Sequence, residues 1–134
     1  MVDIRNEVEK ILEEINERRG KITLSEIRRL FESIGFEEVT PESMASTLGA
    51  SPEEAREYIS FLMSSRESIA GNLVFSYVSP FLFLHHRESG LFVTVEYDYV
   101  LSRGGVYTCT FYTTDALKRD FELFKELLEK ERAR

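Results

Sequence analysis

Histidine and cysteine, the residue types that most often bind metals or act as nucleophiles, are scarce in this chain. His85 and His86 are adjacent in a segment with strand character, so their side chains are expected to point to opposite faces of a sheet. The pair therefore cannot hold one metal ion together. No further histidine and only a single cysteine are available to complete a zinc site. We predict no metal site and interpret both histidines as surface or interface residues.

The single cysteine and one pair of carboxylates are the other candidates for chemistry. Cys109 alternates with its more polar neighbours in step with Tyr107 and Phe111, which places the thiol on the buried face of a strand. A lone cysteine in a chain that also contains histidines is a weak nucleophile signature as well. Glu96 and Asp98 share a strand face and could form a carboxylate pair. Such residues more often lie on the solvated face of a half-buried sheet.

The sequence also contains none of the longer motifs that identify a catalytic site. The chain has no glycine-rich loop of the kind that cradles phosphate groups, and no nucleophile elbow of the hydrolase type. An active site needs several groups with complementary roles in one place. We therefore predict that the protein is not an enzyme and that it uses no cofactor.

Length and composition indicate one domain, spanning residues 1–134. A chain of this size buries roughly two-thirds of its unfolded surface, and 43% hydrophobic residues supply a core without a disulfide or metal. One cysteine cannot form an internal disulfide, which suits a reducing compartment. The amino terminus lacks a signal-peptide pattern, and no apolar run is long enough to cross a membrane. We expect a cytoplasmic protein without membrane association.

The charge balance is acidic, with a net charge of −7 and a pI near 5.0. Neither half of the chain is basic, which counts against broad binding to phosphate groups. The densest basic cluster is Arg18, Arg19 and Lys21, which we interpret as balancing nearby glutamates through pairs such as Glu14–Arg18. Charged residues make up 31% of the chain and are rich in Glu and Arg, a usage typical of heat-adapted proteins.

Helical patterning dominates residues 1–66. Apolar residues recur at helical spacing in two amphipathic segments, which predict helices at 2–19 and 24–34. The spacing of Thr23 and Glu26 is that of a capping box at the start of the second helix.

Two shorter helices follow, separated by Gly49. They are expected at 41–49 and 52–65, and Ser51 and Glu54 have the spacing of a capping box for the later one. An apolar face recurs in each of them, so we expect the two helices to pack against each other.

Residues 67–134 have a different character, since aromatic and β-branched residues favour extended chain there. The pattern predicts an antiparallel meander and then a closing helix near 115–132. The strands are expected near 73–78, 81–86, 91–101 and 105–113. The predicted fold class is therefore α+β: a helical bundle, an antiparallel β-meander and a C-terminal helix.

The segment from residue 40 to 59 resembles the helix-turn-helix of DNA-binding regulators. In that family a small residue such as Ala45 lets the helices cross closely, Gly49 supplies the turn and Ser51 caps the second helix. The matching residues are Met44, Ala45, Leu48, Gly49, Ala50, Ser51, Pro52, Glu53, Ala55, Tyr58 and Ile59. The resemblance implies that the helix at 52–65 is a recognition helix that enters the major groove of DNA.

The same resemblance implies a winged-helix-like DNA-binding regulatory protein, with duplex DNA as its partner and residues 73–86 as its wing. Regulators of this kind commonly act as homodimers, and apolar stripes on the two terminal helices are candidates for the interface. The first stripe is Ile4, Val8, Ile11 and Ile15, and the second is Leu117, Phe121, Phe124, Leu127 and Leu128. The residues expected to face DNA are Ser51, Glu53, Arg56, Glu57, Ser60 and Ser64.

The acidic residues of this recognition helix depart from the family pattern. Glu53 and Glu57 would point outward, with Glu54 close by, and carboxylates repel the phosphate backbone. Glu53 and Glu54 are equally well explained as complements of the positive end of the helix dipole. The alternative function is therefore a non-catalytic protein–protein interaction module on the same fold, without nucleic-acid binding.

Overall fold

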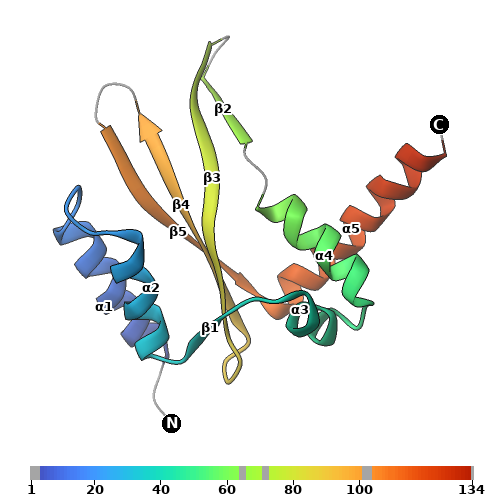
Figure 1. Cartoon of the computed structure of the whole chain (residues 1–134), viewed down its shortest axis with the longest axis horizontal. Coiled ribbons are helices and arrows are strands. Elements are labelled where there is room, and N and C mark those ends of the chain that lie inside the picture. Colours follow the sequence, from blue (N-terminus) through green and yellow to red (C-terminus); the bar gives the residue numbers. More distant parts are fainter. Residues whose placement is uncertain (1–3, 64–65, 71–72, 101–103, 134) are drawn as a thin grey trace.

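In the computed structural model, which describes residues 4–63, 66–70, 73–100 and 104–133, the chain has an α+β fold (Figure 1). The described residues form five helices and five strands. In chain order they are α1 Ile4–Glu17, α2 Leu24–Ser33, β1 Phe36–Glu38, α3 Pro41–Leu48, α4 Pro52–Leu62, β2 Arg66–Ala70, β3 Leu73–His86, β4 Leu91–Val100, β5 Gly104–Thr113 and α5 Thr114–Arg132. All five predicted helices are confirmed to within a few residues at each end.

The local start and stop signals explain these helix bounds. Reciprocal capping boxes begin α2 at Thr23 and α4 at Ser51, as predicted, and α3 begins with a third box at Thr40. Each box satisfies backbone N–H groups that the first turn of a helix leaves free. Gly49 ends α3 in the left-handed region, with φ of 68°, a conformation that costs glycine little. The predicted break between α3 and α4 is therefore confirmed.

The sheet is antiparallel and is built around β3. Strands β3, β4 and β5 form the predicted meander, with β5 at one edge. Two strands had been expected at 73–78 and 81–86, but β3 runs without a break through both segments. A bulge between Pro80 and Leu82 accommodates the proline inside the strand. The wing predicted at 73–86 is therefore wrong as a separate strand pair.

Two short strands that sequence patterning missed share the outer edge of β3. Strand β1 pairs with the carboxyl end of β3 at 84–86, and β2 pairs with its other end at 73–78. The chain leaves the sheet edge after β1, forms helices α3 and α4, and then returns to the same edge as β2. Neither β1 nor β2 has the alternation or length that identifies a strand in sequence.

Helices cover both faces of the sheet, and the predicted single helical bundle is therefore wrong. Helices α1 and α2 lie on one face, while α3, α4 and α5 lie on the other (Figure 1). The period of two along a strand sends Leu82 and Leu84 to the α1–α2 side and Phe83 to the opposite side.

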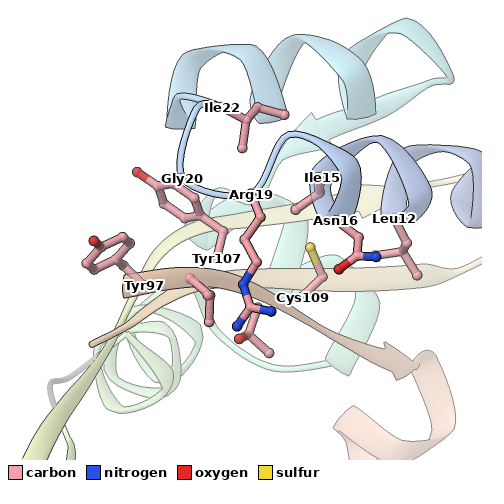
Figure 2. A pocket seen from close by; sticks show the side chains of 11 residues that line it. Leu12, Ile15, Asn16, Arg19, Gly20, Ile22, Tyr97, Tyr107 and Cys109 are labelled. Atoms are coloured by element: carbon pink, nitrogen blue, oxygen red, sulfur yellow. The ribbon is translucent and has the colours of Figure 1, made fainter. Parts of the chain in front are cut away.

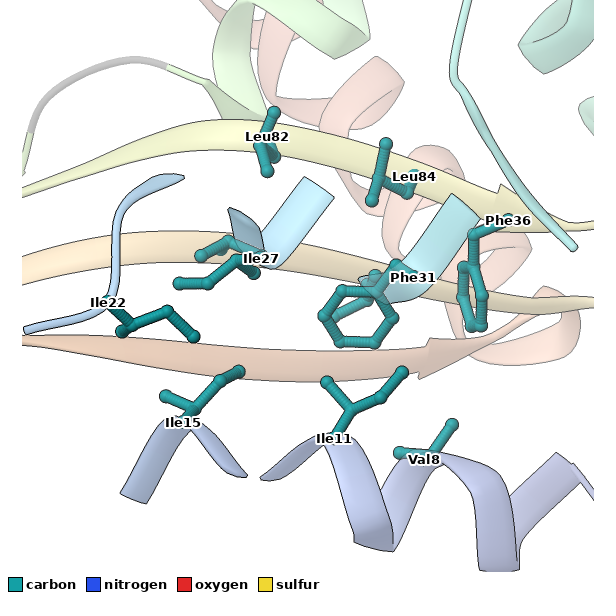
Figure 3. Close-up of a cluster of buried hydrophobic side chains, with 11 residues drawn as sticks. Val8, Ile11, Ile15, Ile22, Ile27, Phe31, Phe36, Leu82 and Leu84 are labelled. Carbon is teal, nitrogen blue, oxygen red and sulfur yellow. The ribbon is translucent and has the colours of Figure 1, made fainter. Parts of the chain in front are cut away.

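The first core lies between the sheet and α1–α2 (Figure 3). Ile11 and Ile15 of α1 and Ile27 and Phe31 of α2 point toward the strands, and Phe36 of β1 closes one end. Phe31 is fully buried and makes an edge-to-face contact with Phe36, with ring centroids 5.1 Å apart. The apolar stripe of the first helix, once a candidate for a dimer interface, is therefore satisfied inside the monomer.

The second core joins α3, α4 and α5 to the opposite face of the sheet. Tyr58 of α4 is fully buried, and its ring lies 5.3 Å from that of Phe121 and 5.5 Å from that of Phe124. Of the C-terminal stripe, Leu117, Phe121 and Phe124 are buried core residues, Leu128 packs against them, and Leu127 is exposed. Glutamate at Phe121 or Phe124 would therefore disrupt this core, so these two side chains are not open to a dimer interface.

Candidate functional site

Helices α3 and α4 pack against each other, as the sequence predicts. Ala45 and Ala55 are buried, and Leu48 and Ile59 pack against the same cluster. Their small and branched side chains let the two helices approach closely at the turn. Ala50, which follows Gly49 in the turn, is partly buried and packs against the same cluster.

The predicted DNA-facing residues lie on the exposed side of α4 where the structure describes them. Ser51, Glu53, Arg56, Glu57 and Ser60 are all exposed, whereas Ser64 lies outside the described residues. The Ser51 hydroxyl accepts a hydrogen bond from the Glu54 backbone N–H, 3.2 Å away, so it is committed to the helix cap. The structure thus brings these side chains to one surface, and that surface is mainly acidic.

Helix α5 flanks this acidic surface and supplies part of its charge balance. Arg132 lies 3.9 Å from the Glu57 carboxylate. A cleft of about 270 Å³ separates the two helices and is lined by more acidic than basic side chains. Its charged residues are Glu53, Glu54, Glu57, Lys125, Glu129 and Arg132. The hydrogen bond from the Ser51 backbone N–H lowers the pKa of the Glu54 carboxyl, which keeps this group negative.

Tyr58 fixes the contact between α4 and α5. Its hydroxyl donates a hydrogen bond to the Asp120 carboxylate, and its ring packs between Phe121 and Phe124. Burial of the phenol, reinforced by the bond to Asp120, raises the pKa of Tyr58, so the hydroxyl stays a donor. The resemblance includes Tyr58 as part of the motif, but no sequence signal identified Asp120 as its partner.

Three large apolar side chains remain exposed beside this contact. Phe61 of α4 is 48% exposed and packs its ring against Phe124, with centroids 4.9 Å apart. On α5, Leu123 and Leu127 are 58% and 57% exposed. Leu123 and Leu127 are four residues apart, so they lie together on one side of the helix, next to Phe124. We call Phe61, Leu123, Leu127 and the adjoining acidic cleft the α4–α5 face.

The histidines point to opposite faces of β3, as predicted, but His86 is buried, so its interpretation as a surface or interface residue is wrong. His85 stacks on Phe92 with ring centroids 4.0 Å apart, and burial lowers the pKa of its imidazole. His86 packs beside Phe36 on the other face, where its Nδ1 accepts a hydrogen bond from the Ser89 backbone N–H. Within the part of the chain that the structure describes, no three histidine, cysteine or acidic residues gather as metal ligands.

A second cleft, of about 460 Å³, lies between the end of α1 and the edge strand β5 (Figure 2). The thiol of Cys109 lies at this cleft, and burial raises its pKa to about 12. A protonated thiol is a poor nucleophile. Arg19 extends across the cleft from the α1–α2 turn. Its neighbour Arg18 instead pairs with Glu14 and Glu26, which confirms the predicted Glu14–Arg18 pair and extends it.

Comparison of the chain with protein-family models, with curated proteins and with solved structures returns no match. No helix among the described residues is long and apolar enough to cross a membrane.

Proposed function

We propose that the protein is a non-catalytic protein–protein interaction module that binds a basic amphipathic helix on its α4–α5 face. Two observations carry this proposal: Phe61, Leu123 and Leu127 are exposed near Phe124, and Phe124 also lines the acidic cleft. Large apolar side chains that gather at the surface are typical of sites where proteins meet.

The apolar part of this face would supply the affinity. An amphipathic helix binds by inserting side chains spaced three or four residues apart into a groove. Phe61 and Leu127 lie on different helices and can contact such side chains from two sides. Each apolar side chain that leaves water completely contributes about 1.5–3 kcal/mol before the costs of association.

The charged part would select the partner. Four glutamates line the cleft against one lysine and one arginine, and Lys125 is already engaged, with its amine 3.2 Å from Glu122. The negative charge of the cleft attracts a partner that has lysine or arginine beside its apolar side chains, and it repels an acidic partner. The proposed partner is therefore both apolar and basic.

A labelled 18-residue helical peptide of leucine and lysine tests the proposal by fluorescence anisotropy. The chain is expected to bind it, and Phe61→Ala and Leu127→Ser are each expected to weaken binding about tenfold, since each removes apolar burial from the interface. The matched control is Leu12→Ser, an exposed leucine of α1 on the other side of the sheet. Its affinity should change by less than about twofold.

Two results would contradict this interpretation. One is equal binding of the peptide by all variants, which would reflect only general attraction to an acidic chain. The other is equal binding of a leucine–glutamate peptide of the same pattern. Sedimentation equilibrium identifies self-association: a dimer that Leu127→Ser dissociates would show that a second copy occupies the face, whereas a 15.6 kDa species leaves it open.

Binding of duplex DNA is the second candidate function, and the capped α3–α4 pair favours it. Ser51, Arg56 and Ser60 are exposed on α4, in the position that the resemblance assigns to a recognition helix. Arg56 makes no ion pair with the described residues and is open to a phosphate group. Glu53 and Glu57 oppose that contact.

Titration of the protein with random-sequence duplex DNA at low salt tests this second candidate. If phosphate contacts hold the complex, affinity should fall steeply as salt rises. Arg56→Glu should weaken binding, and Glu57→Gln should leave it equal or tighter because it also releases Arg132. Absence of binding at micromolar protein would exclude this candidate and leave the interaction module.

A further inference from the structure

The cleft between α1 and β5 has a composition suited to a small ligand. It is lined by apolar side chains, two tyrosine rings and a cation, and its volume of about 460 Å³ lies in the range of small-molecule sites. None of the lining residues that the structure describes is acidic. The cleft lies on the α1–α2 side of the sheet, away from the α4–α5 face (Figure 1).

Arg19 is the distinctive residue of this cleft. Its guanidinium makes no ion pair and no side-chain hydrogen bond with the residues that the structure describes, although the chain has an excess of carboxylates. Figure 2 shows the Arg19 side chain extending from the α1–α2 turn toward β5. The planar fork of a guanidinium matches the two oxygens of a carboxylate.

The surroundings of Arg19 favour a flat apolar body attached to that carboxylate. Tyr97 and Tyr107 pack edge to face with ring centroids 5.1 Å apart, on one flank of the cleft. Leu12 and Ile15 of α1 form part of the opposite wall. Gly20 also lines the cleft, and the space beside it is open, since a β-carbon placed there would meet nothing within 4 Å.

We propose that this cleft binds a small aromatic carboxylic acid, with its carboxylate on Arg19 and its ring against Tyr107 and the apolar wall of α1. The Asn16 amide lines the same cleft and offers a further donor. This site is independent of the proposed function, since it uses none of the residues of the α4–α5 face.

The test uses 6-fluoro-2-naphthoate and its neutral amide as probes, observed by fluorine NMR. The acid is expected to bind with a Kd on the order of 0.1–1 mM, and the amide at least about tenfold more weakly. Arg19→Gln should weaken binding of the acid about tenfold or more, because it removes a charge-assisted pair of hydrogen bonds. Arg19→Lys keeps the charge without the planar fork and should give an intermediate affinity.

The matched control is Arg119→Gln, which makes the same charge change on α5, on the opposite side of the sheet. Its affinity should equal that of the unchanged chain, and circular dichroism should show all variants folded, since both arginines are exposed. The proposal is overturned if the amide binds as well as the acid. It is also overturned if Arg19→Gln and Arg119→Gln have equal effects, or if the acid does not bind at 10 mM. Should Arg19→Gln lose stability, Arg19→Lys gives the decisive comparison.

Discussion

Replacing Phe31 with alanine is expected to lower the free energy of unfolding by about 3–5 kcal/mol, the usual range for a fully buried phenylalanine. Phe31 has no exposed surface and lies between α2, β1 and the sheet, where it contacts the rings of Phe36 and Phe111. Loss of the ring leaves a cavity between the helix and the sheet into which the surrounding structure relaxes only in part. The total stability of a domain of this size is about 5–15 kcal/mol, so this loss would leave the fold marginal.

Phe61→Ala supplies the matched comparison. The side chain is the same, but Phe61 is about half exposed and touches Phe124 at the surface. Its loss should cost about 1 kcal/mol or less, since only part of its surface leaves water on folding. Urea denaturation followed by circular dichroism measures both variants. Similar losses for Phe31→Ala and Phe61→Ala would contradict the assignment of Phe31 to the core and of Phe61 to the surface.

The helices could be predicted from sequence because their signals are local. A capping box such as Thr23–Glu26 or Ser51–Glu54 involves residues three apart, and Gly49 ends α3 through its own backbone conformation. The β4–β5 pair was also predicted, since alternation over ten residues marks each strand. These features need no knowledge of distant parts of the chain.

The arrangement of these elements depends on pairings far apart in sequence and was not predicted. The edge of β3 accepts β1 at one end and β2 at the other, which no local pattern reveals. This pairing separates α1–α2 from α3–α4 and places them on opposite faces of the sheet. The apolar stripe at Phe121 and Phe124 looks the same in sequence whether it packs against Tyr58 or against a second chain. Only the tertiary contact decides between those alternatives.

The residues of the candidate sites also include some that could be predicted from sequence and some that could not. Exposure of Glu53, Arg56 and Glu57 follows from the helical period of α4 and could be predicted. The role of Arg19 could not, because Arg18 and Arg19 are adjacent and have the same side chain. Arg18 pairs with Glu26, eight residues away on the next helix, whereas Arg19 extends over β5, which is almost ninety residues distant in sequence. The folding of the α1–α2 turn onto the sheet separates the two arginines.

The thiol of Cys109 is expected to react with iodoacetamide at least a hundredfold more slowly in the folded chain than in the unfolded chain at pH 8. Burial raises its pKa to about 12 from an ordinary value of 9.0, and the thiolate is the reactive form. A difference of three pKa units lowers the thiolate fraction about a thousandfold at this pH. Because the folded-state pKa is the higher one, the protonated thiol favours the fold fully below pH 9. That contribution is lost as pH rises toward 12.

The measurement is the rate of alkylation at pH 7, 8 and 9, with and without urea, followed by mass spectrometry. The folded-state rate should rise about tenfold per pH unit, since the thiolate fraction does so below the pKa. The matched control combines Cys109→Ser with Thr108→Cys, which moves the only thiol one residue along β5 to an exposed position. That thiol should react at nearly the unfolded rate, because the side chain at position 108 is exposed to solvent. Equal alkylation rates for the two positions would show that Cys109 is accessible as a thiolate. The cleft beside β5 would then contain a nucleophile and not a buried, protonated thiol.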